Sequence, residues 1–180
     1  MQLGTVLSLP KRAIKWCDHH LWLMPFFVFL FFEVVMISLR RFAHWRGLLE
    51  HSEPDVRQQV YSSLTGSSSG LLGFALAAVA ILAVFGQRSV EGQAAKRREE
   101  DLANARMNVI GTFLSSSLML LIVLVVSTIG IAADSKRYGN LVISNLAFCA
   151  ACSAAIGLLL GGLGMGLAVL ERNRADRAQT

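Results

Sequence analysis

Charged residues are scarce in this sequence. Only 16% of its 180 residues are Asp, Glu, Lys or Arg, whereas 54% are hydrophobic and the mean hydropathy is +0.53. Soluble domains carry roughly 25% charged residues, so this composition excludes an ordinary water-soluble protein. The longest polar connection, residues 40–65, is shorter than the ~40 residues below which a lone core rarely folds. The composition therefore predicts a single membrane domain.

Catalytic and cofactor-binding patterns are also missing. The sequence contains no nucleophile motif, no paired carboxylates at a catalytic spacing and no phosphate-binding glycine loop. His44, His51, Glu53 and Asp55 are close in sequence, but their spacing matches no metal motif. We therefore expect a protein that is not an enzyme and that requires neither a metal nor an organic cofactor.

Cysteine is scarce and follows no disulfide or metal-binding pattern. Two of the three cysteines, Cys149 and Cys152, lie three residues apart in an apolar run, where a helix places them on one face. Cys17 is far away in sequence. We interpret the pair as small, weakly polar packing residues.

Four long charge-poor runs are the dominant feature of the chain. Each meets the ~18-residue criterion for a membrane span, and Glu33 is the only charged residue in them. No small-x-small cleavage site follows the first run, so we expect it to be a retained anchor. The sequence predicts an all-α integral membrane protein with an amphipathic interfacial helix at 1–20, spanning helices at 21–39, 66–86, 109–133 and 141–170, and a cytoplasmic helical connection at 87–108.

The distribution of Lys and Arg predicts the orientation. With four spans, the two termini and the connection at 87–108 share one side and hold 11 basic residues, against 6 on the other side. Basic residues gather on the cytoplasmic side of membrane proteins. Both termini should therefore be cytoplasmic, as expected for a multi-pass protein of a bacterial inner membrane.

The last run, 141–170, is rich in glycine. Gly157 and Gly161 form one small-xxx-small pair, and Gly162 and Gly166 form a second, overlapping pair. Glycine pairs at this spacing allow two helix backbones to approach closely in a membrane. We expect these four glycines to be helix-packing positions.

Polar residues inside the runs are candidates for a pore or gate. An acid at membrane depth usually faces a partner, a cavity or water, and hydroxyls flanking an aliphatic belt suit a channel that gates by dewetting. Packing is the alternative, because Glu33 can reach toward Arg40 and hydroxyls can bond within their own helix. The candidates are Glu33, Asn108, Thr112, Ser115, Ser116, Ser127 and Thr128.

The segment before the second run is polar and rich in serine and glycine. We expect a helix to start at Pro54, followed by a flexible stretch at residues 62–70 that is either a membrane mouth or a simple loop. Small residues recur on one helical face, which favours close packing. The face consists of either Gly73, Ala77, Ala80 and Ala83 or Gly66, Gly70, Gly73 and Ala77.

A small four-span chain with almost no soluble mass resembles membrane effectors of bacterial antiphage systems, such as the channel component of Hailong-type systems. The resemblance implies a homo-oligomeric ion channel or pore-forming effector that is gated by a nucleotide-type signal. It also implies that basic residues of the cytoplasmic connection bind that signal, the candidates being Lys96, Arg97, Arg98 and Arg106.

Two alternative functions remain open. Four spans with one embedded acid resemble the small multidrug resistance family, which implies a proton-coupled exporter that uses Glu33. The long polar connections and the position of the glycine-rich helix depart from that family. The third hypothesis is a non-catalytic accessory subunit that docks on a membrane partner through its glycine face. The lipid bilayer is a partner in all three.

Overall fold

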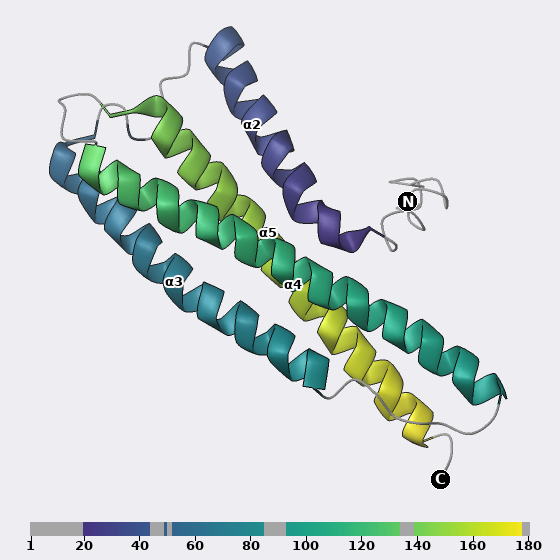
Figure 1. The fold of residues 1–180 in the computed structure, drawn as a ribbon. Coiled ribbons are helices and arrows are strands. Elements are labelled where there is room, and N and C mark those ends of the chain that lie inside the picture. Colours follow the sequence, from purple (N-terminus) through teal and green to yellow (C-terminus); the bar gives the residue numbers. More distant parts are fainter. Residues whose placement is uncertain (1–19, 44–48, 50–51, 85–92, 134–138, 178–180) are drawn as a thin grey trace, which may run out of the picture.

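The chain is helical throughout the part that the structure describes. The computed structural model describes residues 20–43, 49, 52–84, 93–133 and 139–177, and contains no strand within them. A single 3₁₀ turn and four α-helices follow one another along the chain (Figure 1). They are η1 (Leu21–Leu23), α2 (Met24–Ala43), α3 (Pro54–Val84), α4 (Gln93–Ala133) and α5 (Leu141–Arg177).

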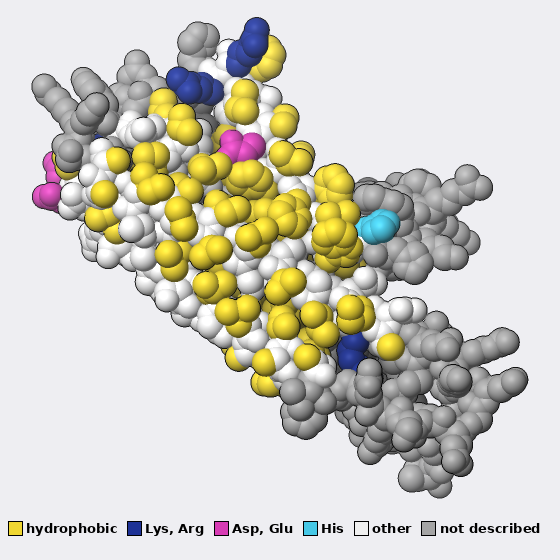
Figure 2. Space-filling model, in the orientation of Figure 1, with side chains coloured by type: hydrophobic (Ala, Val, Ile, Leu, Met, Phe, Trp, Pro, Cys, Tyr) yellow, Lys and Arg dark blue, Asp and Glu magenta, His cyan; other side chains and the backbone are white. Residues whose placement is uncertain are grey.

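All four α-helices are long and apolar enough to cross a membrane, which confirms the number of candidate spans. Figure 2 shows apolar side chains across most of the visible face. The interfacial helix predicted at 1–20 lies almost wholly outside the described residues, which begin at His20. The candidate spans are Leu21–Phe42, Pro54–Ala83, Arg106–Ala133 and Leu141–Gly166.

The second helix begins much earlier than the run 66–86. α3 starts at Pro54, the expected helix start, and continues through the serine- and glycine-rich residues 62–70, so the expected flexible stretch is wrong. Two hydroxyls of this stretch bond to carbonyls of the same helix: Thr65 to the Tyr61 carbonyl at 2.9 Å, and Ser68 to the Leu64 carbonyl at 2.5 Å. Side chains that could have competed with the helix are in this way bonded to it.

α4 is the central helix. It packs along α3 on one side and along α5 on the other (Figure 1). Side chains near the start of α3 and near the start of α5 also contact each other. α2 packs against α5 and more weakly against α4, and η1 rests on α4. The helices thus form a layer in which α2 and α3 are the outer members, and α3 has packed only one side.

Two apolar clusters join the helices. One is centred on Tyr61 and Ala147 and connects α3 with α5, and the Tyr61 ring also lies 3.0 Å from the Cβ position of Gly130 on α4. The other is centred on Met119 and Ala154 and includes side chains of all four α-helices. Neither cluster uses the outward face of α3.

The tightest packing lies where α2, α4 and α5 meet. A Cβ added to Gly157 of α5 would lie 2.8 Å from Pro25 Cγ at the start of α2 and would collide with the Ser116 hydroxyl of α4. The Ser153 hydroxyl, one turn earlier on α5, donates to the Pro25 carbonyl. Ser116, Ser153, Gly157 and Pro25 are all buried. Only a glycine fits at position 157.

The other glycines predicted to pack divide into two groups. A Cβ at Gly161 would lie 3.2 Å from the Phe113 ring of α4, so Gly161 faces inward with Gly157. Gly162 and Gly166 are exposed, and a Cβ at either would have no atom within 4 Å. Within the chain, one small-xxx-small pair packs on α4 and the other faces outward.

The contact at Gly157 predicts a large difference between two similar substitutions. Gly157→Val should lower the free energy of unfolding by about 1–3 kcal/mol, because overpacking forces neighbouring side chains and backbone to shift. Gly162→Val provides the control, since it adds the same side chain to the same helix in open space, and it should change stability by less than about 0.5 kcal/mol. Reversible unfolding of both purified variants in mixed detergent micelles measures the difference. Equal destabilisation by the two would contradict this packing.

Candidate functional site

The hydroxyl stripe of α4 faces inward. Thr112, Ser115 and Ser116 are buried, and each hydroxyl donates to a carbonyl of its own helix. The bond from Thr112 to the Asn108 carbonyl is 2.8 Å long, and those from Ser115 and Ser116 to the Thr112 carbonyl are 3.0 and 2.7 Å. Because Ser116 lies against Gly157, this stripe is a packing surface between α4 and α5 within one chain.

Ser127 and Thr128, the two pore-lining candidates near the carboxyl end of α4, differ in their exposure. Thr128 is exposed, and its hydroxyl donates to the Leu124 carbonyl at 2.7 Å. Ser127 is fully buried, and its hydroxyl oxygen has no hydrogen-bond partner in the described part of the chain. The expected row is therefore not continuous along one surface of α4.

Glu33 is a residue of α2, and its side chain faces α5. Its carboxyl faces the Cys149 thiol of α5, which is buried. One carboxyl oxygen of Glu33 is buried without a hydrogen-bond partner among the described residues, and so is the amide oxygen of Asn145, one turn from Cys149. Two oxygen acceptors and a thiol thus lie along the seam between these helices, away from the hydroxyls that pack around Gly157.

The remaining candidates lie at or beyond the ends of the described side chains. Lys96, Arg97 and Arg98 are in the first turns of α4, but their side chains lie outside the described set, as do those of His44 and His51. Arg106 is half-buried at the start of a candidate span. The proposed roles of these basic residues in ligand binding stay predictions.

The outward face of α3 includes the polar stretch 62–70, which the sequence analysis interpreted as either a membrane mouth or a loop and which the structure places in a helix. Five exposed side chains on it carry a hydroxyl or an amide, and none has a hydrogen-bond partner among the described residues. Three glycines on the same face, Gly66, Gly70 and Gly73, have no atom within 4 Å of an added Cβ. We call the five side chains the outer polar row: Gln59, Ser62, Ser63, Ser67 and Ser69.

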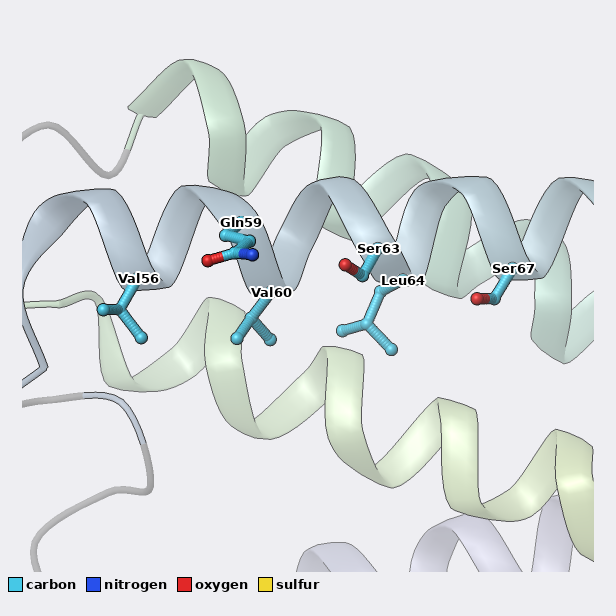
Figure 3. Close-up of a pocket in the computed structure, with 6 residues that line it drawn as sticks. All are labelled: Val56, Gln59, Val60, Ser63, Leu64 and Ser67. Atoms are coloured by element: carbon cyan, nitrogen blue, oxygen red, sulfur yellow. The ribbon is translucent and has the colours of Figure 1, made fainter.

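Part of the outer polar row borders an open groove of about 390 Å³ along α3. Figure 3 shows Val56, Val60 and Leu64 pointing to one side of α3, toward a neighbouring helix, while Gln59 and Ser63 lie on the face of α3 that is turned toward the viewer. The groove is lined by three apolar and three polar side chains of α3, and the polar ones are members of the outer polar row.

Inward and outward hydroxyls differ in their hydrogen bonds, and this difference indicates where a polar path could lie. Inward hydroxyls, such as those of Thr65 and Ser68 on α3 or Ser116 on α4, bond to their own helix. Outward hydroxyls of α3 do not. The sequence pointed to the polar stretch 62–70 but not to its helical structure, and only the helix determines which of its hydroxyls face outward.

Arg57 anchors the first turn of α3, next to the outer polar row. The side chain is fully buried, and its guanidinium donates to the Ser52 carbonyl at 2.5 Å. Its Cδ lies 3.0 Å from the Cβ position of Gly139, which precedes α5. This arginine therefore holds the chain before α3 against the chain before α5. Its burial was not expected from the sequence.

Comparisons with known proteins and a search for metal-binding groups add no functional assignment. No family model, curated protein or solved structure matches the chain. Among the described residues, no group of three or more His, Cys, Asp or Glu side chains could hold a metal ion. The helical surfaces themselves are the basis for a functional proposal.

The bonding of inward hydroxyls predicts opposite outcomes for two serine substitutions. Ser153→Ala should lower the free energy of unfolding by roughly 1 kcal/mol, because it removes the hydrogen bond to the Pro25 carbonyl. Ser127→Ala removes a buried hydroxyl that has no partner, and should leave stability unchanged or raise it slightly. Unfolding in mixed micelles compares them, and a larger loss for Ser127→Ala would show that this hydroxyl does have a partner.

Proposed function

We propose that this chain is the subunit of a homo-oligomeric membrane channel, with both termini in the cytoplasm of a bacterial cell. In this proposal the conducting path runs between copies and is lined by the outer polar row of α3. The observation that carries the proposal is that the outward face of α3, a helix apolar enough to cross a membrane, exposes the five hydroxyl or amide side chains of the outer polar row.

Solvation energetics support a wet environment for this row. Moving a hydroxyl or amide into hydrocarbon without a partner costs roughly 2–7 kcal/mol, depending on the reference. Water in a path between copies, or polar groups of a second copy, would avoid that cost. Lipid would not. A single chain supplies no hydrogen-bond partner for the row among its described residues, and in this proposal further copies of the chain enclose it.

The order of residues along α3 fits a path with a mouth and a constriction. The outer polar row occupies the half of α3 that follows Pro54, and the half from Leu71 to Val84 carries only apolar side chains and glycine. A wettable mouth followed by an apolar narrowing can gate by dewetting. The hydroxyls of α4, which are bonded within the chain, have no role in this path.

Gating would act from the cytoplasmic side. α4 continues toward its amino terminus for 13 residues before its candidate span begins at Arg106, and α5 continues for 11 residues beyond Gly166. These extensions carry Lys96, Arg97 and Arg98. Cationic side chains suit a phosphorylated, nucleotide-type signal, and movement of α4 would be passed directly to α3 because the two helices pack together.

A proton-coupled exporter is the second candidate, and one observation favours it. Glu33 presents a buried carboxyl oxygen that has no partner among the described residues, which is unusual for an acid in an apolar helix. In an exporter this carboxyl would alternate between a proton and a cationic substrate.

Ion flux through reconstituted liposomes tests the channel. In a background without Cys17, Cys149 and Cys152, a charged thiol reagent should reduce the flux of Ser63→Cys at least tenfold, because Ser63 would line the path. Ser116→Cys is the control, since Ser116 is buried against Gly157, and its flux should not change. Absence of flux at every voltage and with nucleotide signals, or block at position 116 alone, would contradict the proposal.

Glu33→Gln separates the two candidates. The substitution preserves the shape of the side chain but cannot exchange a proton. A channel lined by α3 should retain most of its flux, within about threefold of the unsubstituted protein, whereas an exporter should lose all transport driven by a pH gradient. Parallel flux and gradient-driven uptake assays on one liposome preparation provide the comparison, and loss of uptake together with absent channel flux would favour the exporter.

A further inference from the structure

We infer that the parts of α4 and α5 that extend beyond their candidate spans pair with each other through opposite charges, and that this pairing holds the proposed channel closed. The inference rests on the proposed channel and names how it is regulated. We call the pairing the charge latch. It matches Glu99 and Asp101 of α4 with Arg172 and Arg174 of α5.

Two contacts within the candidate spans fix the register of these helices. Gly157 of α5 lies against Ser116 of α4, and a Cβ added to Gly164 would lie 3.1 Å from Val109 Cγ2. The two contacts are seven residues apart on each helix, and residue numbers rise along α5 as they fall along α4. The helices are therefore antiparallel, and α4 begins where α5 ends, at one end of the molecule (Figure 1).

The same register places acids level with arginines beyond the spans. Both helices rise ~1.5 Å per residue, so equal counts outward from the contact at Gly164 stay level. Eight residues outward, Asp101 is level with Arg172, and ten residues outward, Glu99 is level with Arg174. Both acids are on α4 and both arginines are on α5.

The four charged positions flank a seam of small and apolar residues. The seam recurs every seven residues, at Ala95, Leu102 and Val109 on α4 and at Gly161, Ala168 and Ala175 on α5. Positions four and six residues after a seam residue lie on its two flanks, where paired helices place their interhelical ion pairs. On α4 these positions are Glu99 and Asp101, and on α5 they are Arg172 and Arg174.

The described end of the α4 extension agrees with this seam. Ala103, Asn104 and Met107 are exposed, and their positions lie on the helical face opposite to positions 102 and 109. Val109, in contrast, is half-buried and lies against Gly164. The seam side of α4 is therefore the side turned toward α5.

The order of charges along α4 is unfavourable for that helix alone. Three cations, Lys96, Arg97 and Arg98, precede the three acids at 99–101, and no acid lies in the first turn. A helix dipole favours acids near the start, and a cation four residues before an acid is the weaker order for a pair within one helix. The acids of α4 are matched better by α5 than by their own helix.

Opening the latch would free the start of α4. α5 is tied to α2 by the bond from Ser153 to the Pro25 carbonyl, whereas α4 packs along α3, whose outer polar row lines the proposed path. A closed latch thus holds α4, and α3 with it, to the other two helices. Exposed ion pairs are individually weak, and phosphate binds arginine as a carboxylate does. A phosphorylated signal attracted to Lys96 and Arg97 can therefore displace the acids of α4 from the arginines of α5.

Disulfide formation in native membranes tests the seam. In the cysteine-free background, Ala105→Cys combined with Ala168→Cys should form a disulfide within the chain on mild oxidation, because level seam positions bring their Cα atoms within the ~4.4–6.8 Å that a disulfide needs. Asn104→Cys combined with Ala168→Cys is the control, since Asn104 is exposed, and should give at least fivefold less. Thiols that remain on the unfolded monomer measure the yield, and equal yields from the two pairs would contradict the seam.

Charge reversal tests the latch and its role. In the 105/168 cysteine pair, Arg172→Glu with Arg174→Glu should lower the disulfide yield at least fivefold. The same reversal, under reducing conditions, should raise ion flux through liposomes without a signal at least fivefold. Adding Glu99→Arg with Asp101→Arg should restore both values, because the charges are matched again. Glu100→Arg is the control, since its position lies on the outer face of α4, and should change neither.

The two measurements separate the latch from the channel. A disulfide yield that ignores the reversal, or that the compensating reversal does not restore, would overturn the charge latch. Flux that stays at its basal level in a conducting protein whose yield follows the charges would overturn the regulatory role. Yields that follow the charges while no variant conducts would contradict the channel and leave the pairing of α4 with α5 supported.

Discussion

The close approach of α5 to α4 at Gly157 is the contact on which the arrangement of helices depends. Because this residue has no side chain, Ser116 of α4 and Pro25 of α2 can both reach the backbone of α5 at one level. The Ser153 hydroxyl then ties the start of α2 to the same place. With α5 and α2 gathered on one side of α4, α3 packs on the other, and its outer face meets nothing else in the described part of the chain.

This asymmetry divides the polar residues into two kinds. The hydroxyls of Thr112 and Ser116 point into the layer, where they are buried and bonded to carbonyls of their own helix. Hydroxyls that point out from α3, such as those of Ser63 and Ser67, have neither cover nor partner. The same residue type therefore contributes to packing on α4 and to proposed function on α3.

Length and hydropathy were sufficient to predict the helices, but they could not assign faces. Four apolar runs predicted four helices long enough to cross a membrane, and this is confirmed. The stretch 62–70 was predicted to be flexible because serine and glycine disfavour helices in water. It is helical here, with Thr65 and Ser68 bonded to carbonyls of the same helix and the Tyr61 ring packed on Gly130. Such support comes from neighbours that no local pattern specifies.

The same limit applies to the hydroxyls of α4. Its hydroxyls and those of α3 look alike in sequence, and only the position of Gly157 relative to Ser116 decides that the α4 set is inside. The two small-xxx-small pairs of α5 were likewise equivalent in sequence, although Gly161 lies against Phe113 and Gly162 lies in the open. Burial depends on how helices are rotated toward each other, and that rotation is set by tertiary contacts.

The central claim is that the outward face of α3 meets water or protein and not lipid. Spin labels placed one at a time from residue 59 to residue 77 of the protein in lipid bilayers measure this directly, through their accessibility to oxygen and to a water-soluble nickel complex. The account predicts that nickel accessibility peaks at Gln59, Ser63 and Ser67 with a helical period. A maximum of oxygen accessibility on that face would place it in lipid and contradict the account.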